Sequence, residues 1–265
     1  MRDIGHVMMK DYTTMQTGGV ARLIIVEDKK DLQELIQWYH RKIFILGSGS
    51  NLIVKDQGIN GVVLKNEIGG IRIKGNQITA GSGVTMKMLS QFALQDGKTG
   101  LEFAEGIPGT VGGAVYMNAG FNADMASVVT TVEAIIYKSG HPKSIRLSNK
   151  ECEFGFRKSI FQGMKAFITG VTFTLQQEDV HKIAEKMQKN AKLREKRQPL
   201  NFPSSGTIFL KCKDIKRFYG FRINQVEMVA PGFIINHGGG NSYDIIQLIR
   251  KIQKESPAEL EVEIV

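Results

Sequence analysis

The stretch GIPGTVGGAVYMNAG, residues 106–120, constrains the fold of this chain more than any other. Five of its fifteen residues are glycine, yet Val111, Val115 and other apolar residues keep it hydrophobic. A flexible linker would lack the apolar residues, and a core strand would not tolerate so many glycines. Glycine removes the Cβ and permits positive φ, so backbone N–H groups can approach a ligand closely. The stretch predicts main chain packed against a flat or phosphate-rich cofactor, with a tight buried turn without ligand as the alternative.

A second glycine-rich loop, GSGSN over residues 47–51, follows the predicted strand IFILG. Consecutive small residues there can form a nest of N–H donors for a pyrophosphate, to which Ser48 and Ser50 add hydroxyl groups. The loop matches neither GxGxxG nor GxxxxGK[ST], so those nucleotide-binding fingerprints do not apply. Because the two loops lie about fifty-five residues apart, they predict an extended dinucleotide between two subdomains.

Length and cysteine content set outer limits on the class of protein. The chain has 265 residues and is 42% hydrophobic, enough for one large domain or a few small ones. No run approaches the roughly twenty apolar residues of a membrane helix, and the N-terminus does not have the pattern of a secretory signal. Cys152 and Cys212 are the two cysteines and form no CxxC motif. These features predict a cytoplasmic protein without a disulfide framework, zinc site or membrane partner.

The formal charge of +9 is concentrated in residues 182–197, where seven Lys and Arg residues face two Glu residues. Ile183, Met187 and Leu193 recur there at near-helical spacing, which predicts an amphipathic helix. A solvated helix face is the first interpretation, and a field that attracts an anionic small-molecule substrate is the second. Nucleic-acid binding comes last, since no aromatic residues are interleaved with the charges. The basic balance favours a monomer.

The remaining pattern mixes α and β elements without internal repeats. Strands are predicted over residues 21–27, 43–47, 61–65, 166–175, 228–236 and 259–265. Helices are predicted over residues 31–40, 85–95, 182–197 and 242–255. Two hairpins are predicted over residues 71–83 and 128–147, with turns at Gly75-Asn76 and Ser139-Gly140.

Two long segments carry a resemblance to a known family. LGSGSNLIVKDQGINGVVL (46–64) and AGSGVTMKMLSQFALQDGKTGLEFAEGIPGTVGGAVYMNAG (80–120) resemble the FAD-binding region of the UDP-N-acetylenolpyruvoylglucosamine reductase family, which acts in peptidoglycan precursor synthesis. The resemblance continues in order through FGFRKSIF, LREKRQPLNFPSSGTIF, PGFIINHGGG and ELEVEIV. The short path from ITGVTFTL into the basic helix is similar to the family's compact type, which lacks an extra tyrosine-bearing loop.

The resemblance implies an α+β fold: a two-subdomain FAD-binding part of the vanillyl-alcohol-oxidase (PCMH) type, plus a smaller α+β substrate-binding domain. The expected divisions are residues 1–66 with the C-terminal strand 258–265, residues 67–200, and residues 201–257. The implied cofactors are FAD and NADPH, and the implied substrate is a UDP-sugar enolpyruvyl ether. The resemblance implies that NADPH reduces FAD and that the reduced flavin passes hydride to the β-carbon of the ether. A proton then quenches the α-carbon, which gives UDP-N-acetylmuramate.

Three catalytic residues follow from the resemblance. Arg157 in FRKSIF matches the family's arginine and would stabilise the charge of a developing enolate, although Phe156 stands where a tyrosine is usual. Glu263 matches the second glutamate of the LEPEV motif, and strand alternation would point Glu261 the same way. Thr207 in SSGTIF stands where the family has a proton-donating serine. Threonine keeps the hydroxyl but adds a methyl group and stiffens χ1.

Cofactor contacts are implied for both glycine-rich stretches and for two further positions, and no metal is expected. These residues are Gly47, Ser48, Gly49, Ser50, Asn51, Gly81, Ile107, Pro108, Gly109, Thr110, Gly112, Gly113, Asn118 and Ile168. The segment 209–228 departs from the family pattern and lacks an expected asparagine, for which Lys211 and Tyr219 are candidate substitutes. A non-catalytic or repurposed flavin- or nucleotide-binding protein of the same fold is therefore the alternative function.

Overall fold

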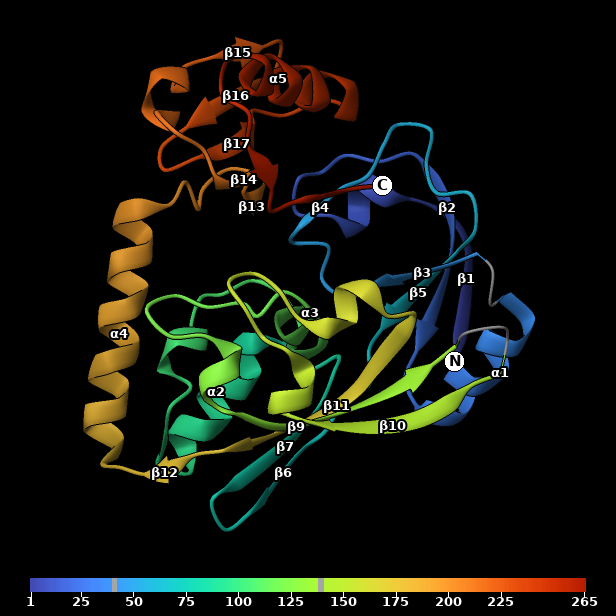
Figure 1. Ribbon diagram of the computed structural model, residues 1–265, viewed down its shortest axis with the longest axis vertical. Coiled ribbons are helices and arrows are strands. Elements are labelled where there is room, and N and C mark those ends of the chain that lie inside the picture. Colours follow the sequence, from blue (N-terminus) through green and yellow to red (C-terminus); the bar gives the residue numbers. More distant parts are fainter. Residues whose placement is uncertain (40–41, 138–140) are drawn as a thin grey trace. The chain divides into compact units, whose positions relative to one another are not determined.

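The computed structural model of the chain describes residues 1–39, 42–137 and 141–265, which form two compact units (Figure 1). Unit 1 comprises Met1–Asp3, Ile24–Gly47 and Val62–Leu193, and unit 2 comprises Ile4–Leu23, Ser48–Gly61 and Arg194–Val265. Each unit is therefore assembled from segments that are distant in the sequence. The three-part division into residues 1–66 with 258–265, 67–200 and 201–257 stays a prediction.

The first sheet has the strand order β1-β2-β5-β3. Its strands are β1 (Arg2–Met8), β2 (Val20–Val26), β3 (Ile43–Leu46) and β5 (Val62–Asn66), of which β3 and β5 pair in parallel. Helix α1 (Lys29–Tyr39) buries Leu32, Leu35 and Ile36 in a core shared with this sheet. This core fixes β3, and with it the position of Gly47 at the end of the strand.

A second sheet, which lies within unit 1, is antiparallel, with the order β10-β9-β11-β7-β6 (Figure 1). The strands are β6 (Ile71–Lys74), β7 (Gln77–Gly81), β9 (Val129–Ile136), β10 (Lys143–Ser148) and β11 (Ala166–Thr174). Helices α2 (Met86–Gln95) and α3 (Val111–Tyr116) share one apolar core with this sheet. Strand β11 is central and buried along nearly its whole length, as expected of its apolar sequence.

A short ribbon and a long helix, whose residues up to Leu193 belong to unit 1, follow the second sheet. Strands β8 (Lys98–Thr99) and β12 (Gln176–Gln177) pair antiparallel just before helix α4 (Val180–Arg197). Ile183 and Met187 of α4 are buried, while most of its lysines are exposed. The helix thus has the amphipathic character that its sequence predicts. No helix among the described residues is long and apolar enough to cross a membrane.

Unit 2 contains a four-stranded sheet of order β13-β17-β16-β15 and one long helix. The strands are β13 (Ser204–Thr207), β15 (Arg222–Ile223), β16 (Val226–Val229) and β17 (Phe233–Asn236). Helix α5 (Ser242–Glu255) starts at the N-cap Asn241, whose side chain accepts a hydrogen bond from the Asp244 amide. Its buried face joins the core of this sheet. Two small pairs complete the unit: β14 (Phe209–Lys211) with β18 (Glu259–Leu260), and β4 (Leu52–Ile53) with β19 (Glu263–Ile264).

The structure confirms most predicted elements, divides two of the predicted strands and adds elements that the sequence does not predict. The strand predicted over residues 228–236 is two antiparallel strands, β16 and β17, because the chain turns at Pro231-Gly232. The strand predicted over 259–265 is also two, β18 and β19, which pair with different partners. Strand β1 was not predicted. The Ser139-Gly140 turn and the last residue of the predicted helix 31–40 lie outside the described residues.

Candidate functional site

The glycine-rich stretch is a turn followed by the short helix α3 rather than an extended loop. Thr110 is the N-cap, and its hydroxyl accepts a hydrogen bond from the Gly113 amide (3.4 Å). The amides of Val111 and Gly112 donate to the carbonyls of Val84 and Ser82, both at 2.8 Å. The stretch is therefore held against residues 82–84 by its own backbone.

Glycines bring the main chain of unit 1 into close contact at this place. A Cβ on Gly112 would lie 3.1 Å from Ser82 Cβ, and a Cβ on Gly81 would lie 2.2 Å from the Gly69 carbonyl oxygen. A Cβ on Gly47 would lie 2.8 Å from Thr110 Oγ1. The end of β3 and the start of α3 thus meet at Gly47 and Thr110, so the beginning of the first predicted loop touches the second.

Several backbone amides at these two places remain available to a ligand. Among the described residues, no protein acceptor takes the amides of Gly47, Ser48, Gly49, Asn51, Gly109 or Thr110. The carbonyl of Gly49, by contrast, is held by both the amide (3.1 Å) and the hydroxyl (3.3 Å) of Thr14. Gly47, Gly109 and Thr110 belong to unit 1, and Ser48, Gly49 and Asn51 belong to unit 2. Within each unit, such neighbouring N–H groups are suited to a phosphate.

A buried polar pair that the sequence did not reveal supports the same part of unit 1. The side-chain amide of Asn66 donates to Ser82 Oγ (2.8 Å) and to the Ile168 carbonyl (3.5 Å). Both side chains are almost fully buried. The pair connects Ile168 in β11 with the segment that receives Gly112, and it brings Gly81, Gly112 and Ile168 together. Single polar residues at strand ends have no pattern from which this could have been recognised.

The other predicted cofactor residues occupy several environments. Ile107 is buried, and its amide donates to the Ala104 carbonyl (3.1 Å). Gly109 has a φ of +128°, which favours glycine there. Ser48 and Ser50 belong to unit 2, as does Asn51. Pro108 directly precedes Gly109, and Gly113 is the third residue of α3.

Arg157 lies in a tight turn of unit 1, between Gly155 and Lys158, which exchange backbone hydrogen bonds of 3.0 and 3.1 Å. Its guanidinium donates to the carbonyls of Asn118 (Nη1, 3.4 Å) and Gly120 (Nη2, 3.1 Å). The guanidinium carbon is also 5.2 Å from the centre of the exposed Phe156 ring. The structure therefore places Arg157 against the end of the glycine-rich stretch.

Thr207 and Glu263 belong to unit 2, whereas Arg157 belongs to unit 1. Thr207 ends β13 and is paired with Phe233 of β17. The Glu263 amide donates to the Asn51 carbonyl (3.0 Å), and the Asn51 side chain donates to the Glu261 carbonyl (3.1 Å). Unit 2 thus joins the GSGSN loop to the C-terminal segment.

The same segment approaches Thr207, because the Glu261 amide donates to the carbonyl of Ile208 (2.9 Å). Glu261 and Val262 form a bend between β18 and β19. A common direction for the Glu261 and Glu263 side chains therefore no longer follows from strand alternation. Both side chains are partly buried.

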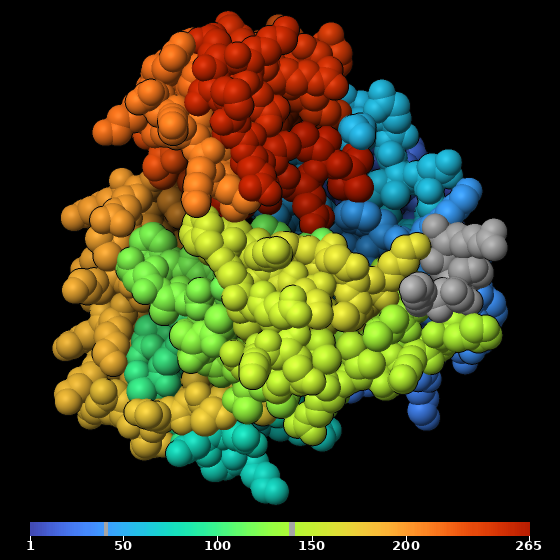
Figure 2. Space-filling view, in the orientation of Figure 1, coloured from blue at the N-terminus to red at the C-terminus, as the bar shows by residue number. Residues whose placement is uncertain are grey.

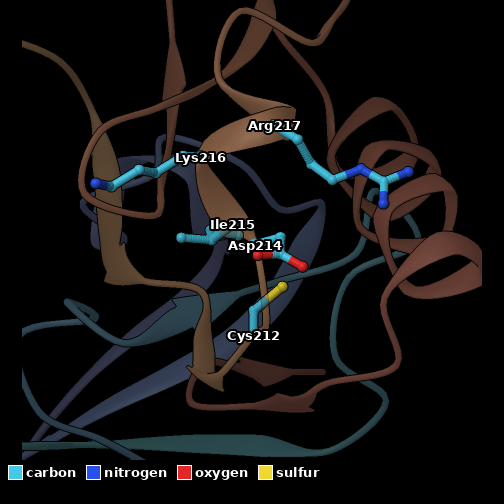
Figure 3. Close-up of a pocket in the computed structure, with 5 residues that line it drawn as sticks. All are labelled: Cys212, Asp214, Ile215, Lys216 and Arg217. Carbon is cyan, nitrogen blue, oxygen red and sulfur yellow. The ribbon is translucent and has the colours of Figure 1, made fainter.

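A pocket of about 490 Å³ lies elsewhere in unit 2, within the segment 209–228 that departs from the family pattern (Figure 3). Its lining residues are Cys212, Asp214, Ile215, Lys216 and Arg217. Lys216 and Arg217 point in opposite directions, and Arg217 forms an ion pair with Glu255 of α5 (2.5 Å). None of the predicted catalytic or cofactor residues lines this pocket.

Comparison with known proteins identifies the class of protein to which this chain belongs. Residues 20–144 match the sequence family described as FAD binding domain. The chain is an FAD-binding flavoprotein with the α+β fold expected from the sequence. A solved structure, UDP-N-acetylenolpyruvylglucosamine reductase from Thermus caldophilus, superposes with a TM-score of 0.88 at 31% identity and covers 100% of this chain and 99% of its own.

Relatives of known name identify the family. UDP-N-acetylenolpyruvoylglucosamine reductase of Pediococcus pentosaceus is 36% identical over 98% of this chain and 92% of its own length. The enzyme of the same name from Bacillus subtilis is 31% identical over 99% and 93%. The chain belongs to the UDP-N-acetylenolpyruvoylglucosamine reductase family.

Proposed function

We propose that this chain catalyses the FAD-dependent reduction of UDP-N-acetylglucosamine enolpyruvate to UDP-N-acetylmuramate, with NADPH as the reductant, in peptidoglycan precursor synthesis. The observation that carries the proposal is the match to reductases over nearly the full length of both chains. The match includes unit 2 as well as the FAD-binding part, so it extends to the residues proposed to handle the substrate.

The flavin, when bound, relays a hydride from NADPH to the substrate, and the protein supplies binding and orientation. The amide donors of residues 47–51 and 109–110 are suited to the diphosphate. The turn at Ile107 and Pro108 and the helix start at Gly112 and Gly113 are proposed to face the flavin end. Gly81 and Ile168 are proposed to complete the set of cofactor residues.

Arg157 is proposed to hold the substrate carboxylate and to stabilise the negative charge that develops there. A guanidinium is suited to this task because it stays charged and presents fixed paired donors. Carbonyls of Asn118 and Gly120 already fix its direction. Since the group is oriented before the charge forms, it favours the transition state over the ground state.

Thr207 is proposed to donate the proton that quenches the α-carbon, and Glu263 to share a proton with the developing enol. Both roles need a group positioned within hydrogen-bonding reach of the substrate. Strand pairing holds Thr207 opposite Phe233, and the Asn51 carbonyl holds the Glu263 backbone. These backbone constraints support a fixed position for each side chain.

An anaerobic experiment tests the function. The purified protein is reduced with NADPH and then mixed with the enolpyruvyl substrate, and flavin absorbance is followed through both half-reactions. Substrate-dependent reoxidation is expected. Flavin that is reduced but never reoxidised would instead support a non-catalytic or repurposed flavin-binding protein.

Arg157→Ala extends the same experiment to one residue. Reduction by NADPH should stay within a few-fold of the wild type, and reoxidation by substrate should fall at least about 100-fold, because electrostatic stabilisation is lost. Arg146→Ala is the matched control, since Arg146 is an exposed arginine of the same unit that contacts Thr131. Equal loss of both half-reactions would contradict the role given to Arg157.

We expect a cytoplasmic monomer without nucleic-acid or membrane partners. We also expect it to be organised in three parts, which are residues 1–66 with 258–265, residues 67–200 and residues 201–257. Both cysteines are free thiols in the structure, which is in keeping with a reducing compartment. Light scattering on the eluted protein measures its mass, and a value near 29.4 kDa is expected.

A further inference from the structure

The side chain of Asn118, at the end of the glycine-rich stretch, is fully engaged inside unit 1. Its Nδ2 group donates to Asp124 Oδ2 (3.1 Å) and to the carbonyl of Gly155 (2.8 Å). Its Oδ1 atom accepts a hydrogen bond from the Ala126 amide (2.9 Å). The residue is 2% exposed. A carboxamide has two N–H donors, and both are used here, so neither is left to bind a cofactor.

Asn118 holds the turn of Arg157 at two points. Its side chain binds the carbonyl of Gly155, where the turn begins, and its own carbonyl accepts from Arg157 Nη1 (3.4 Å). Beyond the turn, Ser159 Oγ donates to the Tyr116 carbonyl (2.7 Å). Hydrogen bonds thus hold both ends of the turn against residues at the C-terminal end of α3. Asn118 bonds both the start of the turn, at Gly155, and the guanidinium of Arg157.

The backbone makes such ties necessary. Arg157 has a φ of +54° and Asn118 a φ of +42°. Asparagine enters the left-handed region readily, whereas arginine does so at a cost that surrounding contacts must offset. Without the bond from Asn118 to Gly155, the turn is free to relax, and the guanidinium would lose its fixed direction.

We infer that Asn118 is a positioning residue for Arg157 and that its carboxamide acts through this turn rather than as a cofactor ligand. The inference rests on the proposed role of Arg157 in binding the substrate carboxylate. It replaces the cofactor contact expected for the Asn118 side chain. Its consequence is specific: loss of the carboxamide should impair the substrate half-reaction and spare both flavin binding and reduction by NADPH.

The test uses Asn118→Gly, because glycine accepts the positive φ and removes only the side chain. Asn149→Ala is the matched control: Asn149 of the same unit also donates to two backbone carbonyls, those of Ala126 (2.9 Å) and Val129 (2.8 Å). Both variants are prepared with bound FAD, alone and combined with Arg157→Ala. Flavin content, reduction by NADPH and reoxidation by the enolpyruvyl substrate are measured for each.

Asn118→Gly should keep its FAD and its reduction rate, and its reoxidation should slow about 10- to 100-fold, as expected for a misplaced charged group. In the Arg157→Ala background, the same change should slow reoxidation less than about twofold, since coupled residues are not additive. Asn149→Ala should behave like the wild type in all three measurements.

Other outcomes would overturn the inference in distinguishable ways. Loss of FAD from Asn118→Gly would restore a cofactor role. If Asn118→Gly slowed reoxidation by the same factor in the Arg157→Ala background as in the wild type, Asn118 would act independently of Arg157. Normal reoxidation in Asn118→Gly beside an impaired Arg157→Ala would overturn the inference alone. An unimpaired Arg157→Ala would overturn the role proposed for Arg157 and, with it, this inference.

Discussion

The methyl group of Thr207 has a defined place in unit 2. Its Cγ2 atom lies 3.7 Å from the position that a Cβ on Gly232 would occupy. Gly232 itself has a φ of +112° in the turn between β16 and β17, so a glycine is favoured there. Because 3.7 Å is an ordinary van der Waals separation, the extra methyl group does not press on this turn. Threonine can therefore stand in the serine position without crowding the adjacent turn.

Two variants of Thr207 separate the hydroxyl from the methyl group. Thr207→Ser keeps the hydroxyl, and we expect substrate-dependent flavin reoxidation within about threefold of the wild type. Thr207→Val keeps the shape but removes the proton donor, which should slow reoxidation by about 100-fold or more. Both rates are measured by anaerobic stopped-flow absorbance after reduction with NADPH. Retention of activity by the valine variant would assign the proton to another group.

Cys152 gives a prediction for alkaline pH. Burial, helped by the neighbouring Glu151 carboxylate, raises the pKa of this thiol from 9.0 to about 11. The folded protein therefore holds the proton more tightly than the unfolded chain, and this stability is complete below pH 9 and lost as the pH rises through 11. Between pH 8.5 and 11 the free energy of unfolding should fall by about 2 kcal/mol more in the wild type than in Cys152→Ala. Urea unfolding across this range measures the difference, and parallel curves would contradict the prediction.

Helices and strands are predictable from the sequence where the residues that define their ends and their apolar face lie within the segment itself. Helices α2 and α5 were predicted within a residue of their observed bounds, because apolar periodicity and the caps Thr85 and Asn241 lie within each segment. Strand β1 was missed because its residues are mostly exposed and show no apolar alternation. Its pairing with β2 is a long-range property.

The two predicted strands that the structure divides differ in whether the break can be read from the sequence. The Pro231-Gly232 dipeptide was a readable turn signal inside the predicted strand 228–236, and it separates β16 from β17. The break between β18 and β19 had no such signal, because it arises from pairing with β14 and β4, two distant segments. Motif resemblance supplied the candidate residues, but the support from Asn66, Ser82 and Thr14 could be seen only in the folded chain.

Glu102 joins helix α4 to the loop at residues 99–100 of unit 1. The nearly buried Glu102 carboxylate accepts hydrogen bonds from Thr99 Oγ1 (2.5 Å) and the Gly100 amide (2.8 Å). It also pairs with Lys186 of α4 (3.6 Å), and its backbone carbonyl accepts from Asn190 (3.0 Å). One side chain therefore supports a loop and a helix together.

Glu102→Ala should lower the free energy of unfolding by about 2 kcal/mol, because it leaves two part-buried donors, the Thr99 hydroxyl and the Gly100 amide, without their acceptor. Lys182→Ala is the control: Lys182 is exposed and forms a surface pair with Glu178 at 3.8 Å, so its loss should cost less than about 1 kcal/mol. Urea unfolding at neutral pH measures both. Similar small effects would mean that α4 is held by its apolar face alone.

At the scale of the whole molecule, the net charge of +9 favours association with an anionic substrate. Side chains of α4 project from the surface in Figure 2, and several of its lysines are exposed. A UDP-sugar that bears a carboxylate carries several negative charges. The protein's field should therefore speed the encounter between the two without changing the chemical steps that follow.

This field predicts a specific response to salt. Between 20 and 200 mM ionic strength, kcat/KM for the enolpyruvyl UDP-sugar should fall several-fold, because a shorter Debye length screens the attraction, while kcat should change little. The combined variant Lys182→Gln, Lys189→Gln and Lys192→Gln removes three exposed positive charges of α4, and it should flatten this dependence. Steady-state kinetics over a salt series measures both proteins. A kcat/KM that is independent of salt in the wild type would leave the basic face of α4 as a solvated surface, and an unchanged slope in the variant would assign the attraction to charges outside α4.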